Sequence, residues 1–208
     1  MEKGCGWAER PGPKAQGAGA HAPNGWTGGT RGRGGKRALV VASEGMSRIR
    51  SVVVTHEGGM RFRAVTGSGR ILIFGDDPEA NEHSPVEAVA ASVAGCSAMD
   101  VVSILGKKRQ VLTSYLVEAR ADQRDEYPQV FTRIDIVHIL VGTVLLESAV
   151  RRAIELSASK YCPVNAMVSA GATEVHHAFR MRCTGAEPKE ASGEVIVTGP
   201  DRRPDVVP

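Results

Sequence analysis

The stretch SPVEAVAASVAGCSAMDVVSIL, residues 84–105, decides the fold. Ser84 is a common helix N-cap residue, Pro85 suits the first helical position, and Glu87 stands where a capping box has its acidic residue. Apolar residues then recur at helical spacing and form one stripe: Val86, Val89, Val93, Cys96, Val101 and Ile104. The stretch predicts one long helix, from residue 85 to about residue 107, with a face that packs against a sheet or another helix.

Three short segments before this helix have the pattern of strands. Residues 48–55 (RIRSVVVT), 60–66 (MRFRAVT) and 70–74 (RILIF) are β-branched or alternating, and the turns HEGG and GSG separate them. The pattern predicts a three-stranded antiparallel meander.

The segments after the helix predict a hairpin, two helices and a final strand. They are, in order, strands at 111–123 and 131–142, a charged amphipathic helix at 145–161, a short helix beginning at Pro163, and a strand at 172–181. The order of the main elements is β-β-β-α-β-β-α-β, so the fold class is α+β.

Composition divides the chain into three parts. We expect residues 1–47, rich in Gly and Arg, to be a disordered tail, because they bury too little apolar surface to offset their chain entropy. Residues 48–182 form the folded domain, and the polar residues 183–208 form a second disordered tail. Residues 1–50 carry nine Lys or Arg against three Glu, a net +6, whereas the whole chain is +3. The basic charge therefore belongs to the tail and does not predict a nucleic-acid-binding domain.

The chain reads as cytoplasmic, without a membrane or nucleic-acid partner. No window approaches the roughly 18–20 apolar residues that span a bilayer, and no compact apolar stretch of a secretory signal opens the chain. An organelle transit peptide is an alternative for the leader, which its glycine density disfavours, and an upstream extension before Met46 is another. The RGRGG at 31–35 resembles RNA-binding segments, but a solvated tail is the simpler interpretation.

Two cysteines in unlike settings are the candidate functional residues. A thiol pair that meets in the fold is a redox couple, a metal site or simply core. Cys96, on the apolar face of the long helix, is expected to have a raised pKa and little reactivity. Cys162, next to the start of the short helix, is expected to be the easier thiolate.

A zinc site is disfavoured by the spacing of the possible ligands. Neither cysteine has a partner at C-x-x-C spacing, and His176 and His177 point to opposite faces of a strand, so at most one of them faces the core. Cys5 and Cys183 fall in the tails and are expected to be free, exposed thiols.

The segments SPVEAVAASVAGCSAMDVVSILGKKRQ and SASKYCPV together resemble the osmotically inducible protein C and organic hydroperoxide resistance (OsmC/Ohr) superfamily. The resemblance covers about residues 50–182 and rests on two cysteine motifs. It implies an intertwined homodimer in which two long helices cross at the centre, with active sites at the subunit interface. It also implies thiol peroxidase activity on small organic hydroperoxides, in defence against oxidative stress.

Carried over onto this chain, the resemblance gives each cysteine a role. Cys96 would be the peroxidatic thiolate that becomes a sulfenic acid, and Cys162 would be the resolving thiol that condenses with it to a disulfide. The resemblance implies an external dithiol as reductant of the disulfide, with a dihydrolipoyl protein as the family's usual one. No metal, flavin or other cofactor is implied, because the thiolate is the nucleophile.

The family's activating arginine and glutamate are matched less well. The glutamate position is Val86 here, and Glu87 lies nine residues before Cys96, a rotation of about 180° on an ideal helix. In GGMRFRA the candidate arginines are Arg61, which fits slightly better, and Arg63 on the same strand face. Val86 keeps a second function open, a non-catalytic, stress-associated binding dimer that uses the same scaffold and cavity.

Overall fold

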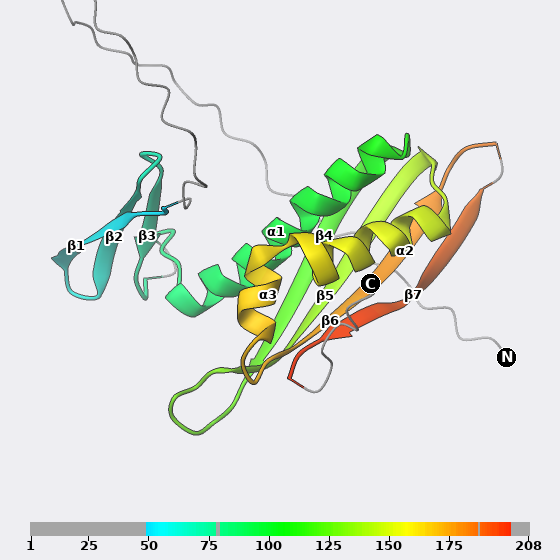
Figure 1. Ribbon diagram of the computed structural model, residues 1–208. Coiled ribbons are helices and arrows are strands. Elements are labelled where there is room, and N and C mark those ends of the chain that lie inside the picture. Colours follow the sequence, from blue (N-terminus) through cyan, green and yellow to red (C-terminus); the bar gives the residue numbers. More distant parts are fainter. Residues whose placement is uncertain (1–48, 78–79, 187, 201–208) are drawn as a thin grey trace, which may run out of the picture. The chain divides into compact units, whose positions relative to one another are not determined.

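The computed structural model describes residues 49–77, 80–186 and 188–200, and the predicted N-terminal tail lies outside them (Figure 1). The described elements are β1 (Val52–Gly58), β2 (Arg61–Thr66), β3 (Ile71–Phe74), α1 (Pro85–Lys107), β4 (Val111–Gln123), β5 (Phe131–Val144), α2 (Glu147–Leu156), the π-helix η1 (Ser157–Tyr161), α3 (Pro163–Ser169), β6 (Glu174–Cys183) and β7 (Lys189–Thr198). They form a three-stranded sheet β1-β2-β3 and a four-stranded sheet β4-β5-β6-β7. The predicted α+β class is confirmed.

Strand β7 corrects the predicted C-terminal tail. Residues 183–208 read as disordered from their polar composition, yet Lys189–Thr198 pairs antiparallel with β6. Most of its side chains are exposed or half-buried, as expected of a strand at the edge of a sheet. The strand contains a β-branched run of Val195, Ile196 and Val197, and Val195 packs against the core, so the local signal was present but the polar composition of the whole tail obscured it.

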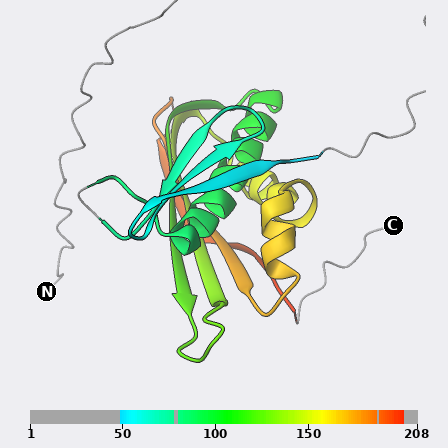
Figure 2. The same ribbon diagram turned by 90° about the vertical axis from the view of Figure 1, so that its left-hand side faces the viewer.

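The four-stranded sheet carries the three α-helices on one of its faces. Strands β4 and β5 form the predicted long hairpin, and β5 and β6 run parallel. On β5 and β6 the side chains alternate between buried and half-buried, so one face of each strand is covered. Helices α1, α2 and α3 lie together on that covered face (Figures 1 and 2).

Helix α1 begins and ends where the sequence predicts. The backbone N–H of Ser84 donates to Glu87 Oε2 at 3.3 Å, which is half of the predicted capping box. The buried stripe is only partly the predicted one, since Val93 and Val101 are buried but Val86 is exposed. Length and composition alone would let α1 cross a membrane, so the expectation that no window reaches this length is wrong. Its valines and alanines raise the average hydropathy, and only 22% of this apolar window is buried within one chain.

The meander β1–β3 has little core of its own. Its strands pair antiparallel in the predicted order. In β1 every residue is exposed, and in β2 only Ala64 is buried. Among the described residues its hydrogen bonds to the rest of the chain reach the loop before α1, where His83 N–H donates to Ile73 O at 3.0 Å.

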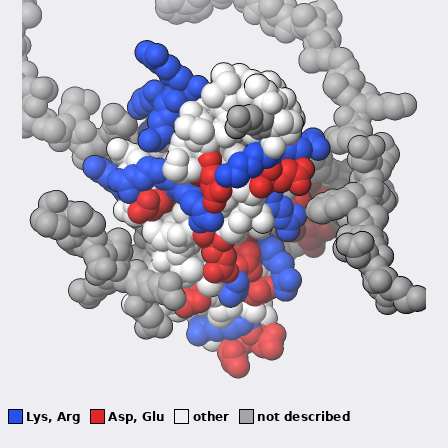
Figure 3. Space-filling model, turned by 90° about the vertical axis from the view of Figure 1, so that its right-hand side faces the viewer, with Lys and Arg blue, Asp and Glu red and all other residues white. Residues whose placement is uncertain are grey.

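Charged side chains of both signs are mixed on the face that Figure 3 presents, with Lys and Arg beside Asp and Glu. On α2, Arg151 pairs with Glu147 at 3.0 Å, and Lys189 of β7 lies 3.6 Å from the same carboxylate. This face therefore lacks the single-sign basic surface that binding to phosphate backbones requires.

Candidate active site

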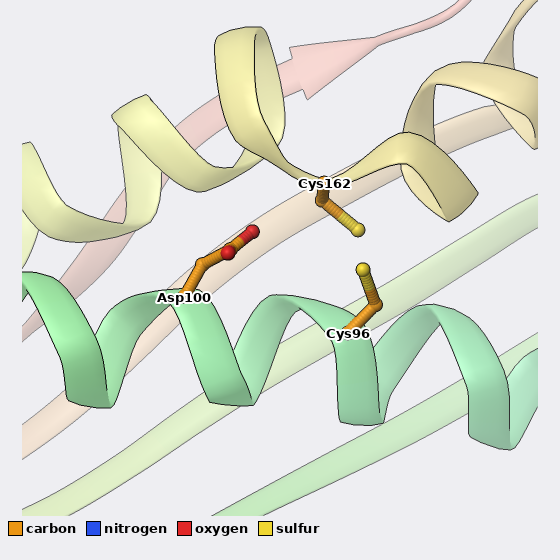
Figure 4. A group of neighbouring side chains, drawn as sticks. All are labelled: Cys96, Asp100 and Cys162. Carbon is orange, nitrogen blue, oxygen red and sulfur yellow. The ribbon is translucent and has the colours of Figure 1, made fainter. Parts of the chain in front are cut away.

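Cys96 of α1 and Cys162, which follows η1, come together in the fold. Their sulfur atoms and a carboxylate oxygen of Asp100 all lie within 4.8 Å of one another. Figure 4 shows the two thiols pointing toward each other across the gap between α1 and the η1–α3 junction, with Asp100 beside them. Both cysteines are free thiols. A disulfide needs the sulfurs at about 2.05 Å, so a small approach of the two elements would close it.

The π-helical turn η1 determines where Cys162 lies. The N–H of Cys162 donates to Ser157 O at 2.9 Å, a bond to the fifth residue back that is typical of a π-turn. Cys162 then becomes the N-cap residue of α3, and its sulfur accepts the backbone N–H of Asn165 at 3.3 Å. The end of one helix and the start of the next thus turn the thiol toward α1.

A polar pair beside the sulfurs fixes Asp100. The hydroxyl of Ser157 donates to Asp100 Oδ2 at 3.1 Å and lies 3.2 Å from the hydroxyl of Ser97. Ser97 and Ser157 are fully buried, whereas Asp100 is half-buried. The carboxylate therefore has a partner within its own chain.

Burial reverses the expected ionisation of Cys162. Desolvation raises its pKa to about 12, and a side-chain hydrogen bond with Cys96 acts in the same direction. The backbone N–H groups of Asn165 and Val164 lower the pKa, as the helix geometry predicts, but their effect is the smaller one. The expectation that Cys162 is the easier thiolate is wrong, because local helix geometry does not report how much protein covers the sulfur.

The same three side chains could hold a metal ion. Two thiols and one carboxylate are ligands that Zn²⁺ accepts, with a fourth position left for water. The sequence spacing argued against zinc because it considered ligands close in the chain. Cys162 lies far from Cys96 and Asp100 in sequence, so only the fold brings this set together.

The predicted activating residues lie apart from the thiols in this chain. Among the described residues, no hydrogen bond or ion pair joins Arg61, Arg63 or Glu87 to either cysteine. Arg61 instead pairs with Glu57 at 3.1 Å and with Glu82, whose side chain is only 5% exposed. These carboxylates raise the pKa of the Arg61 guanidinium, with the Glu82 hydrogen bond the largest cause.

Glu82 is a residue that sequence reasoning missed. It lies in the loop before α1, five positions before the Glu87 that the search for a carboxylate selected. Glu87 is exposed and caps α1 through Ser84, so the capping interpretation fits its contacts. A turn-rich loop gave no signal that one of its acids would be buried against an arginine.

Cys183 is a further correction. It was expected to be exposed in a tail, but it is the last residue of β6, is buried, and donates its S–H to Thr143 O at 3.6 Å. Backbone N–H groups of Gly185 and Leu145 lower its pKa. Cys5 lies outside the described residues.

A groove of about 910 Å³ runs between α1 and the edge strand β4. Small side chains from α1 line one wall, and Tyr115, Leu116 and Val117 of β4 line the other. Gly95, the residue before Cys96, also lines it, but neither Cys96 nor Cys162 is among the lining residues. It is large enough for a small apolar molecule or for an apolar segment of another chain.

The fold and the thiol site together define a class of protein. The family model of the OsmC-like proteins matches residues 77–178, and the chain belongs to this family. The resemblance noted in the sequence is thereby confirmed.

A known protein of similar sequence also supports membership of this family. Protein YhfA of Escherichia coli strain K12 is 37% identical over 120 residues, which are 58% of this chain and 89% of YhfA.

Solved structures agree on the fold. A hypothetical protein from Aquifex aeolicus VF5 is 27% identical, with a TM-score of 0.59 over 65% of this chain and 97% of that one. An OsmC-like protein from Mycoplasma pneumoniae is 10% identical, with a TM-score of 0.57 over 65% of this chain and 99% of that one. The second likeness concerns the fold alone.

Proposed function

We propose that this protein is a cytoplasmic, homodimeric thiol peroxidase that reduces small organic hydroperoxides through Cys96 and Cys162. One observation carries the proposal: the two sulfurs lie within 4.8 Å of each other in a chain of the OsmC-like family. Cys96 is half-buried, whereas Cys162 is only 2% exposed. The first thiol is the one that a substrate can reach, which fits their peroxidatic and resolving roles.

The reaction has two chemical steps. The Cys96 thiolate attacks the distal oxygen of ROOH, the O–O bond breaks, and the products are Cys96–SOH and RO⁻, which takes a proton to become ROH. The Cys162 thiol then attacks the sulfenic sulfur, the S–O bond breaks, and the thiol proton leaves with the hydroxyl group as water. An external dithiol reduces the disulfide by exchange and is itself oxidised to a disulfide.

The high pKa of Cys162 suits the second role. A thiol that stays protonated does not compete for peroxide and repels no thiolate at Cys96. Its proton is needed in the second step to complete the water molecule. The cation that stabilises the Cys96 thiolate is proposed to be Arg61, held by Glu57 and Glu82.

A homodimer is supported by apolar surface that one chain leaves uncovered. Val52, Val53 and Val54 of β1 are more than half exposed, as is Met99 of α1. Exposed apolar residues that cluster on one strand and on the long helix are typical of surfaces that associate. A second copy would cover them and could bring its Arg61 to the thiols.

The test is a rapid-mixing assay of the fully reduced protein with cumene hydroperoxide, with thiols and disulfides scored by mass spectrometry. We expect one intramolecular disulfide between Cys96 and Cys162 per peroxide consumed. Cys162→Ser should stop at the sulfenic acid, and Cys96→Ser should not react. Assays with and without a chelator separate this result from metal bound at the same thiols. Unreacted thiols under excess peroxide would rule out the peroxidase.

A second function, a binding dimer without catalysis, is favoured by the groove. Its walls are mainly small and apolar, and valine stands where the family's peroxidases have glutamate. In that case the reduced protein would keep its thiols in peroxide but would bind an apolar fluorescent probe in a manner that Gly95→Leu blocks.

A further inference from the structure

A chain of buried hydrogen bonds crosses the whole four-stranded sheet and ends at Cys162. The hydroxyl of Tyr115 on β4 lies 2.6 Å from Nδ1 of His138 on β5. Nε2 of His138 lies 3.4 Å from Nδ1 of His177 on β6. Nε2 of His177 then lies 3.1 Å from Oδ1 of Asn165 on α3, the residue whose backbone N–H donates to the Cys162 sulfur.

The fourth strand closes the chain. The side-chain NH₂ of Asn165 donates to Thr198 Oγ1 on β7 at 3.1 Å and to Ala158 O in η1 at 2.9 Å. Asn165 is completely buried, and every polar atom of its side chain has a partner. Each strand of the sheet thus contributes one residue to a network that holds the first turn of α3.

The chemistry of the partners fixes the direction of every proton. Both amide hydrogens of Asn165 are used, so its Oδ1 must accept and His177 Nε2 must carry a hydrogen. In a neutral imidazole the other nitrogen accepts, so His177 Nδ1 accepts from His138 Nε2. By the same rule His138 Nδ1 accepts from the Tyr115 hydroxyl. A single arrangement of protons therefore satisfies the whole chain.

The surroundings keep all these groups uncharged. Desolvation lowers the pKa of His138 to about 3 and that of His177 to about 4, and it raises the pKa of Tyr115. His138 and His177 are at most 1% exposed. A neutral network of this kind favours one geometry, because breaking any bond leaves a buried polar group unpaired.

We propose that this chain, Tyr115–His138–His177–Asn165 with Thr198, is a positioning network that holds the Cys162 thiol in place for disulfide formation with Cys96. None of these residues except Asn165 touches the cysteine, so the others act through Asn165. The inference rests on the proposed function for its biological purpose. Its physical content is narrower: the network sets how readily two sulfurs 4.8 Å apart or less become bonded.

The network should affect one chemical step and leave the other alone. Oxidation of Cys96 by peroxide does not involve Cys162, so that step keeps its rate when the network is broken. Closure of the disulfide depends on the position and orientation of the Cys162 sulfur relative to Cys96. Small misplacements of reacting groups have large effects on rate. Broken networks should therefore accumulate Cys96 sulfenic acid.

The experiment measures closure without peroxide. The reduced full-length protein is mixed with oxidised dithiothreitol, which is reduced as the Cys96–Cys162 disulfide forms, and the disulfide is quantified after alkylation at a temperature where each variant is folded. We expect His177→Leu to close about tenfold more slowly. His177→Gln, whose amide N–H can reach Asn165, should recover most of the rate. Thr198→Val, which removes one bond only, should slow closure by about threefold.

The matched control is Thr173→Val. Thr173 is also buried and loses one hydrogen bond, to Phe131 O at 2.8 Å, but it has no contact with the network. It should lower the melting temperature without slowing closure. Folded His177→Leu or Thr198→Val protein that closes at the wild-type rate would overturn the proposal. Wild-type protein that closes with oxidised dithiothreitol but ignores cumene hydroperoxide would overturn the peroxidase function alone.

Discussion

The helix-covered sheet and the N-terminal meander differ in how much of their surface one chain can cover. On β5 and β6 the inward side chains are buried under three helices, whereas the meander buries only Ala64 in its first two strands. The thiols, Asp100 and the histidine network belong to the covered part. Arg61, the proposed cation, belongs to the uncovered one. A single chain therefore brings the two sulfurs together but leaves the proposed activating charge, Arg61, on a surface still open to a partner.

The largest expected contrast between the two regions is their response to acid. His138 and His177 are held neutral, with folded pKa values of about 3 and about 4 against about 6.5 when unfolded. The stabilisation is present above pH 6.5 and is lost as pH falls toward 4, because only the unfolded chain binds the protons. We expect a loss on the order of 3–5 kcal/mol between pH 6.5 and 4.5.

Denaturant titrations at several pH values measure this loss, and hydrogen exchange should locate it in β5 and β6. His177→Gln should remove about half of the pH dependence, since one of the two histidines is gone. His176→Gln is the control, because His176 lies on the other face of β6 beside Glu174. A stability that is flat from pH 7 to 4.5 would contradict the neutral network.

The next largest effect should show which chemical step depends on the positive charge of Arg61. Arg61→Ala is expected to slow the reaction of Cys96 with cumene hydroperoxide by about ten- to a hundredfold, as loss of a charge-stabilising group does in other active sites. Disulfide closure with oxidised dithiothreitol also begins with thiolate attack and should slow as well, whereas conversion of preformed Cys96 sulfenic acid to the disulfide should be unchanged. Arg63→Ala is the matched control on the same strand face, and an equal effect of both would show that general charge, not Arg61, matters.

A smaller effect should reveal what covers the meander. Val53 is 67% exposed, so Val53→Ser costs the isolated chain little. If a second copy buries Val53, the change should weaken association by about 1–2 kcal/mol, read as a rise in the dissociation constant by sedimentation velocity. Val144→Ser on β5, also exposed, is the comparison. A monomeric wild-type protein at high concentration would refute the dimer.

The smallest effect concerns Glu87. Because its carboxylate accepts from Ser84 N–H, Glu87→Ala should lower the free energy of unfolding by about 0.5–1 kcal/mol. The rate with peroxide should stay within about twofold of wild type, since the side chain only caps the helix. A much slower peroxide reaction would return Glu87 to the catalytic set, with the partner chain as the means of contact.

The order of elements could be predicted because each one carries its own periodic signal. The sequence predicted the meander, α1, the hairpin and the helix start at Pro163. The strand periodicity also predicted that at most one of His176 and His177 faces the core, and His177 is the buried one. Strand β7 was missed although Val195, Ile196 and Val197 form a β-branched run, because residues 183–208 were judged by their polar composition as a whole.

The thiol pair could be predicted from motifs, but its setting could not. His138 had a usable signal, since period two puts it on the face of Ile136 and Leu140. Its bond to Tyr115, the role of Asn165 and the burial of Glu82 depend on neighbours that only the fold supplies. The prediction that Cys162 ionises easily was wrong for the same reason, because the desolvation that raises its pKa depends on the packed protein.

The position of Cys162 depends on the number of residues in the π-turn at Ser157–Tyr161. It contains one residue more than an α-helical turn, and each residue turns an α-helix by about 100°. Deleting one residue there would rewind the segment as ordinary helix and swing Cys162 away from α1, with both cysteines still in the sequence. A related chain with one residue fewer between α2 and α3 would therefore keep both cysteines but separate the two sulfurs. Counting cysteines in an alignment would miss it.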